Sequence, residues 1–274
     1  MTYNGIDISN HNGKVNWSKV VETIDFVMIR AGYGRNNIDG QLTNNVKGCQ
    51  SYSIDFGFYW FSYALDTADA KNEADYVCDI ADKYHPTYPI AYDWEYDSDD
   101  YAKKRGVTIS NQKREEFAKA FLNRVKERGY IPMLYTNIDY INKGFSNLTS
   151  KYDIWLAQWG VSKPSRSCKM WQKTSSGKVN GISGNVDLNV GYKDYTEKTG
   201  NNTNTSINDN KETKTNIQSE LEKVKNTYWN TYLAIAEDAC KGKYGNGNDR
   251  KKKLKNLGYD YDLVQSIVNI LVKK

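Results

Sequence analysis

The residues best suited to chemistry lie in the segment YPIAYDWEYD, residues 88–97. Asp93 and Glu95 are two positions apart on an expected strand, where side chains at i and i+2 share a face and lie roughly 6.5–7 Å apart. Burial beside another carboxylate raises the pKa of at least one of them, which yields an acid with a base or a stabilising anion. Hydrolysis of a glycosidic bond needs such a pair. The alternative is that D-W-E only ends a strand, because more aspartates follow at once.

Two further acids stand in comparable places. Asp7 lies between Ile6 and Ile8 in GIDIS, and Asp187 lies in VDLNV, close to the last expected strand. An acid between two apolar residues of a strand points away from their face, so we expect Asp7 to face the mouth of a barrel. Acids at the ends of different strands converge at the carboxyl-terminal face of such a barrel, where barrel enzymes place their sites.

The elements that must position these acids are eight short apolar runs alternating with helical patterns. Helices are expected over 67–82 and 110–129, since apolar residues recur there with helical spacing. This alternation favours parallel strand–helix–strand units, and eight strands in under 200 residues predict a compact (β/α) barrel of the TIM type with some helices missing or short. An open doubly wound sheet is the rival, but no G-x-G-x-x-G follows the first strand. The expected strands are residues 5–9, 26–34, 55–64, 88–97, 131–137, 152–160, 169–174 and 186–191.

Composition divides the chain in two. Residues 198–216 contain one apolar residue, Ile207, and predict a solvated linker between domains at 1–197 and 217–274. The first domain holds 24 basic and 24 acidic residues, whereas residues 230–274 hold 9 and 5. The second domain is expected to be a small all-α, three-helix domain preceded by an amphipathic helix that begins at Ile217. The protein is expected to be a monomer, with a homodimer through residues 217–232 as the alternative.

Several classes of function are disfavoured. No apolar run approaches the roughly 20 residues of a membrane-spanning helix. With two histidines and no C-x-x-C pair, the chain offers no zinc ligand set, and no metal or cofactor is expected. A sequence pI of 8.7 is too low to suggest nucleic acid as a partner. The start of the sequence does not resemble a signal peptide, so synthesis in a cytosol is expected.

Residues 1–195 resemble the lysozymes of glycoside hydrolase family 25. The resemblance rests on the blocks GIDIS, VMIRAGYG, GFYWFSYA, PIAYDWE, GYIPMLYTN, DIWLAQWG and the final WQKTSSGKVNGISGNVDLN, in this order. It implies an irregular β/α barrel that cleaves the β-1,4 bond between N-acetylmuramic acid and N-acetylglucosamine. It also implies that Glu95 is the catalytic acid. Its implied partners are Asp93, Asp7 and Asp187, and the implied groove aromatics are Tyr59, Tyr63, Tyr135 and Trp159, for which core packing is the equal alternative.

Residues 236–269 are similar to the short cell-wall-binding repeats of some phage lysozymes, through GKYGNG and LGYDYD. This resemblance implies a module that recognises peptidoglycan. Together the two resemblances predict a phage endolysin that is made in the host cytosol and acts on the wall after release. The alternatives are a bacterial or prophage autolysin and a non-catalytic wall-binding protein. A chitinase-like enzyme would carry D-x-x-D-x-D-x-E, which is absent, and a wall amidase or peptidase usually needs a metal.

Overall fold

The computed structural model describes residues 2–196, 231–257, 259 and 261–272. The chain divides into two compact units, residues 1–200 and 201–274, which are considered separately below. The linker expected at 198–216 lies outside the described residues. So do the amphipathic helix that follows it and nearly all of the segment expected to form a dimer.

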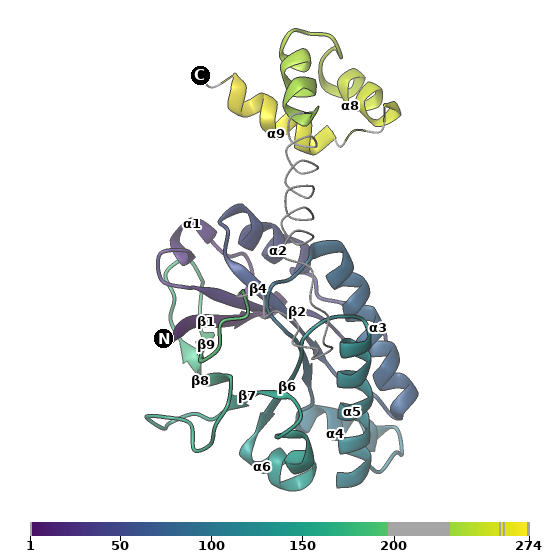
Figure 1. Ribbon diagram of the computed structural model, residues 1–274, viewed down its shortest axis with the longest axis vertical. Helices are drawn as coiled ribbons and strands as arrows, with labels where there is room; N and C mark the ends of the chain where they lie inside the picture. Colours follow the sequence, from purple (N-terminus) through teal and green to yellow (C-terminus); the bar gives the residue numbers. More distant parts are fainter. Residues whose placement is uncertain (1, 197–230, 258, 260, 273–274) are drawn as a thin grey trace, which may run out of the picture. The chain divides into compact units, whose positions relative to one another are not determined.

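The first unit is a closed barrel of eight strands, and each strand expected from the sequence is present (Figure 1). Around the barrel the order is β1, β2, β4, β5, β6, β7, β8 and β9, and β9 pairs back onto β1. A further short strand, β3 (Asn37–Ile38), forms a hairpin with β2. The barrel strands are β1 (Tyr3–Ile8), β2 (Phe26–Tyr33), β4 (Asp55–Phe61), β5 (Ile90–Asp93), β6 (Pro132–Asn137), β7 (Asp153–Ala157), β8 (Met170–Gly177) and β9 (Val186–Gly191).

The expectation of a TIM-type barrel was wrong in one respect. The last strand, β9, runs antiparallel to both its neighbours, β8 and β1, whereas the other barrel pairs are parallel. The expectation that some helices would be missing is confirmed, because the described residues form no helix between β7 and β8 or between β8 and β9. Only residues 178–185 connect β8 to β9, which is too short for the crossover that a parallel neighbour would need.

Helices cover the outside of the parallel strands. The two expected helices are present as α3 (Thr67–Tyr84) and α5 (Asn111–Glu127), which lie side by side on one flank of the barrel (Figure 1). Asp66 and Ser110 cap them by accepting backbone N–H bonds. The remaining helical segments are α1 (Trp17–Val20), α2 (Leu42–Ser51), α4 (Tyr96–Lys104), α6 (Ile138–Tyr140) and short turns at Asn10–Asn12, Ile141–Phe145 and Ser146–Leu148.

Alternation along the strands separates two apolar layers. Outward residues such as Ile6 and Ile8 pack against the helices. Inward residues such as Phe26, Met133 and Trp155 fill the barrel. At the carboxyl ends of the parallel strands the inward positions become polar, which places the candidate chemistry on top of a packed apolar floor.

The second unit holds three helices among its described residues: 231–240, α8 (Gly247–Asn256) and α9 (Tyr261–Leu271). Its small core includes Tyr232, Ala236 and Leu254. The basic run 250–255 is not uniformly a solvated face, because Arg250 is 8% exposed and donates to the carbonyls of Gly245 and Ala239. Neither unit has a described helix that is long and apolar enough to cross a bilayer.

Candidate active site

All four acids singled out in the sequence line one cavity of about 350 Å³ at the carboxyl ends of the parallel strands. We call it the acid cavity. Each acid comes from a different place in the fold: Asp7 from β1, Asp93 from the end of β5, Glu95 from the turn after it, and Asp187 from β9. The other lining residues are Ser9, His11, Asn12, Arg30, Tyr59, Phe61, Tyr135, Trp155, Trp159, Gln172, Ser175 and Asn185.

Asp7 and Asp187 form the first carboxyl pair. They are direct partners in the β1–β9 ladder, because the reversal of β9 brings its first residues to the end where the parallel strands finish. Their carboxyls lie close enough to influence each other's pKa values. Burial and the charge of Asp187 raise the pKa of Asp7 well above its ordinary value, and burial raises the pKa of Asp187.

Asp93 and Glu95 form the second pair, but not as the sequence suggested. Strand β5 ends at Asp93, and Glu95 is the N-cap residue of α4 in extended conformation, so the two do not share a strand face. The two carboxyls nevertheless lie close enough to influence each other's pKa values. Burial followed by the charge of Glu95 raises the pKa of Asp93, and burial followed by the charge of Asp97 raises the pKa of Glu95. Asp93 is 3% exposed, whereas Glu95 is half-buried, so Glu95 is the member accessible to a bound molecule.

Arg30 brings a positive charge to the same cavity. A bulge in β2 between Arg30 and Gly32 turns the strand here, and a Cβ on Gly32 would lie 2.6 Å from the ring of Trp60. Arg30 donates from Nε to Asp39 at 2.8 Å and from Nη2 to Asn10. Its charge opposes the burial that raises the pKa of Asp93. The sequence reasoning missed this residue.

Three of the four expected aromatic residues line the acid cavity. Tyr59 and Tyr135 form part of its floor, with their rings edge-on to Trp155 at centroid distances of 5.9 and 4.7 Å. Trp159 is 54% exposed and offers a free face. Tyr63 does not line the acid cavity. Strand β4 ends at Phe61, so Tyr63 lies beyond the strand that carries Tyr59, and it lines a neighbouring recess of about 300 Å³.

The amides that hold Asp7 were also missed. Asn189 and Gln172 donate to its Oδ2 at 2.7 and 3.0 Å. Gln172 in turn accepts from the Tyr135 hydroxyl at 3.2 Å and from the Trp159 indole at 3.1 Å, so it joins the acids to the aromatic residues. The signal was present in the sequence, because these amides occupy inward positions of strands whose neighbouring inward residues are apolar or acidic.

Comparison with known proteins identifies the family. Residues 6–182 match the sequence profile of glycosyl hydrolases family 25. The chain belongs to this family. Residues 234–272 match the CW_7 repeat, in agreement with the expected wall-binding repeat.

Individual relatives are distant. Lysozyme M1 of Streptomyces globisporus is 28% identical over 198 residues, which cover 68% of this chain and 66% of that protein. Among solved structures, the catalytic domain of endolysin ply40 from bacteriophage P40 of Listeria monocytogenes is 27% identical, with a TM-score of 0.61, and covers 72% of this chain and 97% of that one. The modular autolysin LytC of Streptococcus pneumoniae, in complex with synthetic peptidoglycan ligand, is 29% identical with a TM-score of 0.60, and covers 70% of this chain and 47% of that one. The chain thus spans about two thirds of Lysozyme M1 and about half of LytC.

Proposed function

We propose that this protein is an N-acetylmuramidase that hydrolyses the β-1,4 bond between N-acetylmuramic acid and N-acetylglucosamine in bacterial peptidoglycan. The observation that carries the proposal is the acid cavity, in which two pairs of neighbouring carboxyls with raised pKa values lie beside exposed Trp159. Membership of the family and the LytC complex with a peptidoglycan ligand support the choice of substrate.

In the mechanism that we propose, Glu95 donates its proton to the leaving glycosidic oxygen and later removes a proton from the attacking water. Two roles are open to Asp93: to stabilise the oxocarbenium-like centre, or to orient the 2-acetamido group of the substrate for internal attack. Asp7 and Asp187 then hold the charge and geometry of the cavity.

Digestion of purified walls tests the proposal. We expect new reducing ends and muropeptides cut at the muramic acid, detected by mass spectrometry. Glu95→Gln should lower the rate by about 10²–10⁴-fold, because the substitution removes the general acid. Glu127→Gln, on the exposed side of α5, is the matched control and should leave the rate unchanged. New free amino groups without reducing ends would instead identify an amidase or peptidase, and binding without either product would identify a non-catalytic wall-binding protein.

We further propose that the protein is a phage endolysin made in the host cytosol, with the CW_7 repeat holding it on the wall. The likeness to endolysin ply40 and the exposed lysines 251–253 of α8 support this proposal. Lysis of host cells from within should require a co-expressed phage pore protein, and wall binding should weaken as salt rises. Lysis without the pore protein would favour the autolysin alternative.

A further inference from the structure

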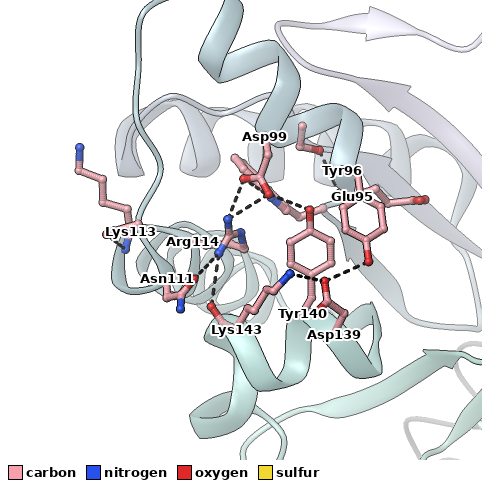
Figure 2. A network of polar contacts seen from close by, with 12 residues as sticks. Glu95, Tyr96, Asp99, Asn111, Lys113, Arg114, Asp139, Tyr140 and Lys143 are labelled. Carbon is pink, nitrogen blue, oxygen red and sulfur yellow. Dashed lines mark hydrogen bonds and ion pairs between the residues drawn. The ribbon is translucent and has the colours of Figure 1, made fainter.

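A second cluster of polar side chains lies close to Glu95 but does not line the acid cavity (Figure 2). Its centre is the carboxylate of Asp99 in α4. Arg114 donates to both oxygens of Asp99, at 2.8 and 3.0 Å, and the Tyr140 hydroxyl donates at 2.7 Å. The indole N–H of Trp94 donates to the same carboxylate at 3.3 Å. We call these four residues the Asp99 cluster.

The Asp99 cluster joins elements that follow two neighbouring strands. Trp94 follows β5, Tyr140 belongs to α6 directly after β6, and Arg114 comes from α5. Arg114 is 6% exposed and also donates to Asn111 at 2.9 Å and to the carbonyl of Lys143 at 3.3 Å (Figure 2). One carboxylate therefore fixes how the turn after β5 sits against the turn after β6.

The Asp99 cluster is linked through the chain to the proposed catalytic residues. Trp94 is the residue between Asp93 and Glu95, and its ring is fully buried. Glu95 lies beyond the end of β5, so no strand ladder holds it. Its backbone is held by the first turn of α4, where the Ser98 hydroxyl accepts from the Glu95 N–H at 3.1 Å and the Asp99 N–H donates to the Glu95 carbonyl at 3.4 Å.

A second set of contacts, made by Tyr96, also holds the turn after β5 against α6. The ring of Tyr96, the residue after Glu95, packs against Tyr140 with centroids 5.0 Å apart. The Tyr96 hydroxyl donates to Asp139 at 3.0 Å, and Asp139 also accepts from Lys143 at 2.8 Å (Figure 2). The residues on both sides of Glu95 are therefore anchored to α6, while the Glu95 side chain faces the acid cavity.

We propose that Asp99 is a positioning residue, which holds Glu95 against Asp93 through Trp94 and the first turn of α4. The inference rests on the muramidase function proposed above. In Asp99→Asn, the buried guanidinium of Arg114 loses its counter-charge, and an amide NH₂ donor replaces one of the two oxygens that accept from Arg114, Trp94 and Tyr140. Glu95 is then free to turn toward solvent, where the burial that raises its pKa is reduced.

The chain supplies a matched control for the test. Asp82 of α3 accepts from an arginine, Arg128, at 2.7 Å and from a tyrosine hydroxyl, Tyr130, at 2.5 Å. Asp82 thus shares an arginine and a tyrosine donor with Asp99 but has no tryptophan donor, and it does not line the acid cavity. Asp99→Asn and Asp82→Asn therefore remove equivalent charges, and only the first is next to the proposed catalytic pair.

Both variants should be compared with the wild-type chain on solubilised glycan strands, by measuring kcat, KM, thermal midpoint and the pH dependence of kcat. For Asp99→Asn we expect kcat to fall about 10–100-fold while KM changes little, since a small misplacement of a catalytic group costs this much. The alkaline limb of its pH profile should move to lower pH, because Glu95 gives up its proton more readily. Asp82→Asn should lower the thermal midpoint without either change.

The outcomes separate this proposal from the function on which it rests. If the wild-type chain releases no reducing ends, both fail together. If the wild-type chain is active and folded Asp99→Asn keeps its kcat and its alkaline limb, only the positioning role is overturned. Should Asp99→Asn not fold, Trp94→Phe and Tyr140→Phe each remove one donor. A fall in kcat with unchanged KM in both variants would support the proposal, and wild-type kcat in both would overturn it.

Discussion

Carboxylates lie close to arginines in two regions of the barrel unit, and their pKa values shift in opposite directions there. At the seam between α3 and α5, Arg128 donates to Asp75 at 2.9 Å and to Asp82 at 2.7 Å. Hydrogen bonds from Tyr130 and Arg128 lower the pKa of Asp82. In the acid cavity burial and neighbouring carboxyls raise the pKa of Asp93 instead. Acids placed among donors on a surface stabilise the fold when ionised, whereas acids buried beside one another keep protons available for chemistry.

The largest effect on activity is expected from Asp93→Asn, which removes a buried carboxyl from the acid cavity. We expect kcat to fall at least about 10²-fold, because the neutral amide replaces the carboxylate that stabilises the oxocarbenium-like centre or orients the 2-acetamido group. The same variant should be more stable than wild type at pH 7. A carboxyl with a raised folded pKa destabilises the fold as pH rises from its ordinary pKa of 3.8 through the folded value, and asparagine removes that loss.

Unfolding by denaturant at pH 3.5 and pH 7 tests whether Asp93→Asn raises or lowers the free energy of unfolding. The gain in stability should be present at pH 7 and should be largely lost near pH 3.5, where wild-type Asp93 is protonated in the folded state and mostly protonated in the unfolded state. A variant that is less stable than wild type at pH 7 would contradict the charge argument.

The pH dependence of activity should show an intermediate effect. The acid must carry its proton, and burial raises the pKa of Glu95 above its ordinary 4.5. Activity should therefore persist above pH 4.5 and decline as pH rises through the raised value, by about tenfold per pH unit for a single proton. Initial rates of reducing-end release across pH 3–9 test this, and a decline already complete at pH 4.5 would refute it.

The smallest effect should come from Arg128→Met at the seam. Its ion pairs are partly exposed and screened, so we expect a loss of about 1 kcal/mol in the free energy of unfolding, and a smaller loss at high salt. The rate of wall digestion at 25 °C should not change. A lowered kcat in this variant would mean that the seam and the cavity are coupled, and the comparison between them would no longer hold.

Much of the fold could be predicted from the sequence, because buried strands appear as short apolar runs. The buried residues Phe117, Phe121 and Val125 of α5 likewise recur with helical spacing. The antiparallel direction of β9 was not predicted, although the connection between β8 and β9 is too short for a parallel crossover. A strand that continues into D-W-E looks the same in sequence as one that stops at Asp93, and for this reason Glu95 was placed on the strand rather than at the start of α4.

The candidate site was predicted unevenly for a physical reason. Asp7 and Asp187 stand out because an acid between apolar strand residues is unusual. Gln172 and Asn189 are neutral, so they attract attention only once the inward face of each strand is known. Asp99 looked like part of a surface loop, and its three donors come from sequence positions as far as 41 residues away.

The reversed last strand also determines where the barrel starts and finishes. Tyr3 at the beginning of β1 pairs with Gly191 at the end of β9, while Asp7 and Asp187 pair at the acid cavity. The two ends of the barrel are thus neighbours, on the side away from the chemistry. A short peptide could join them and new termini could be opened in an exposed loop elsewhere, so the enzyme unit is suited to circular permutation.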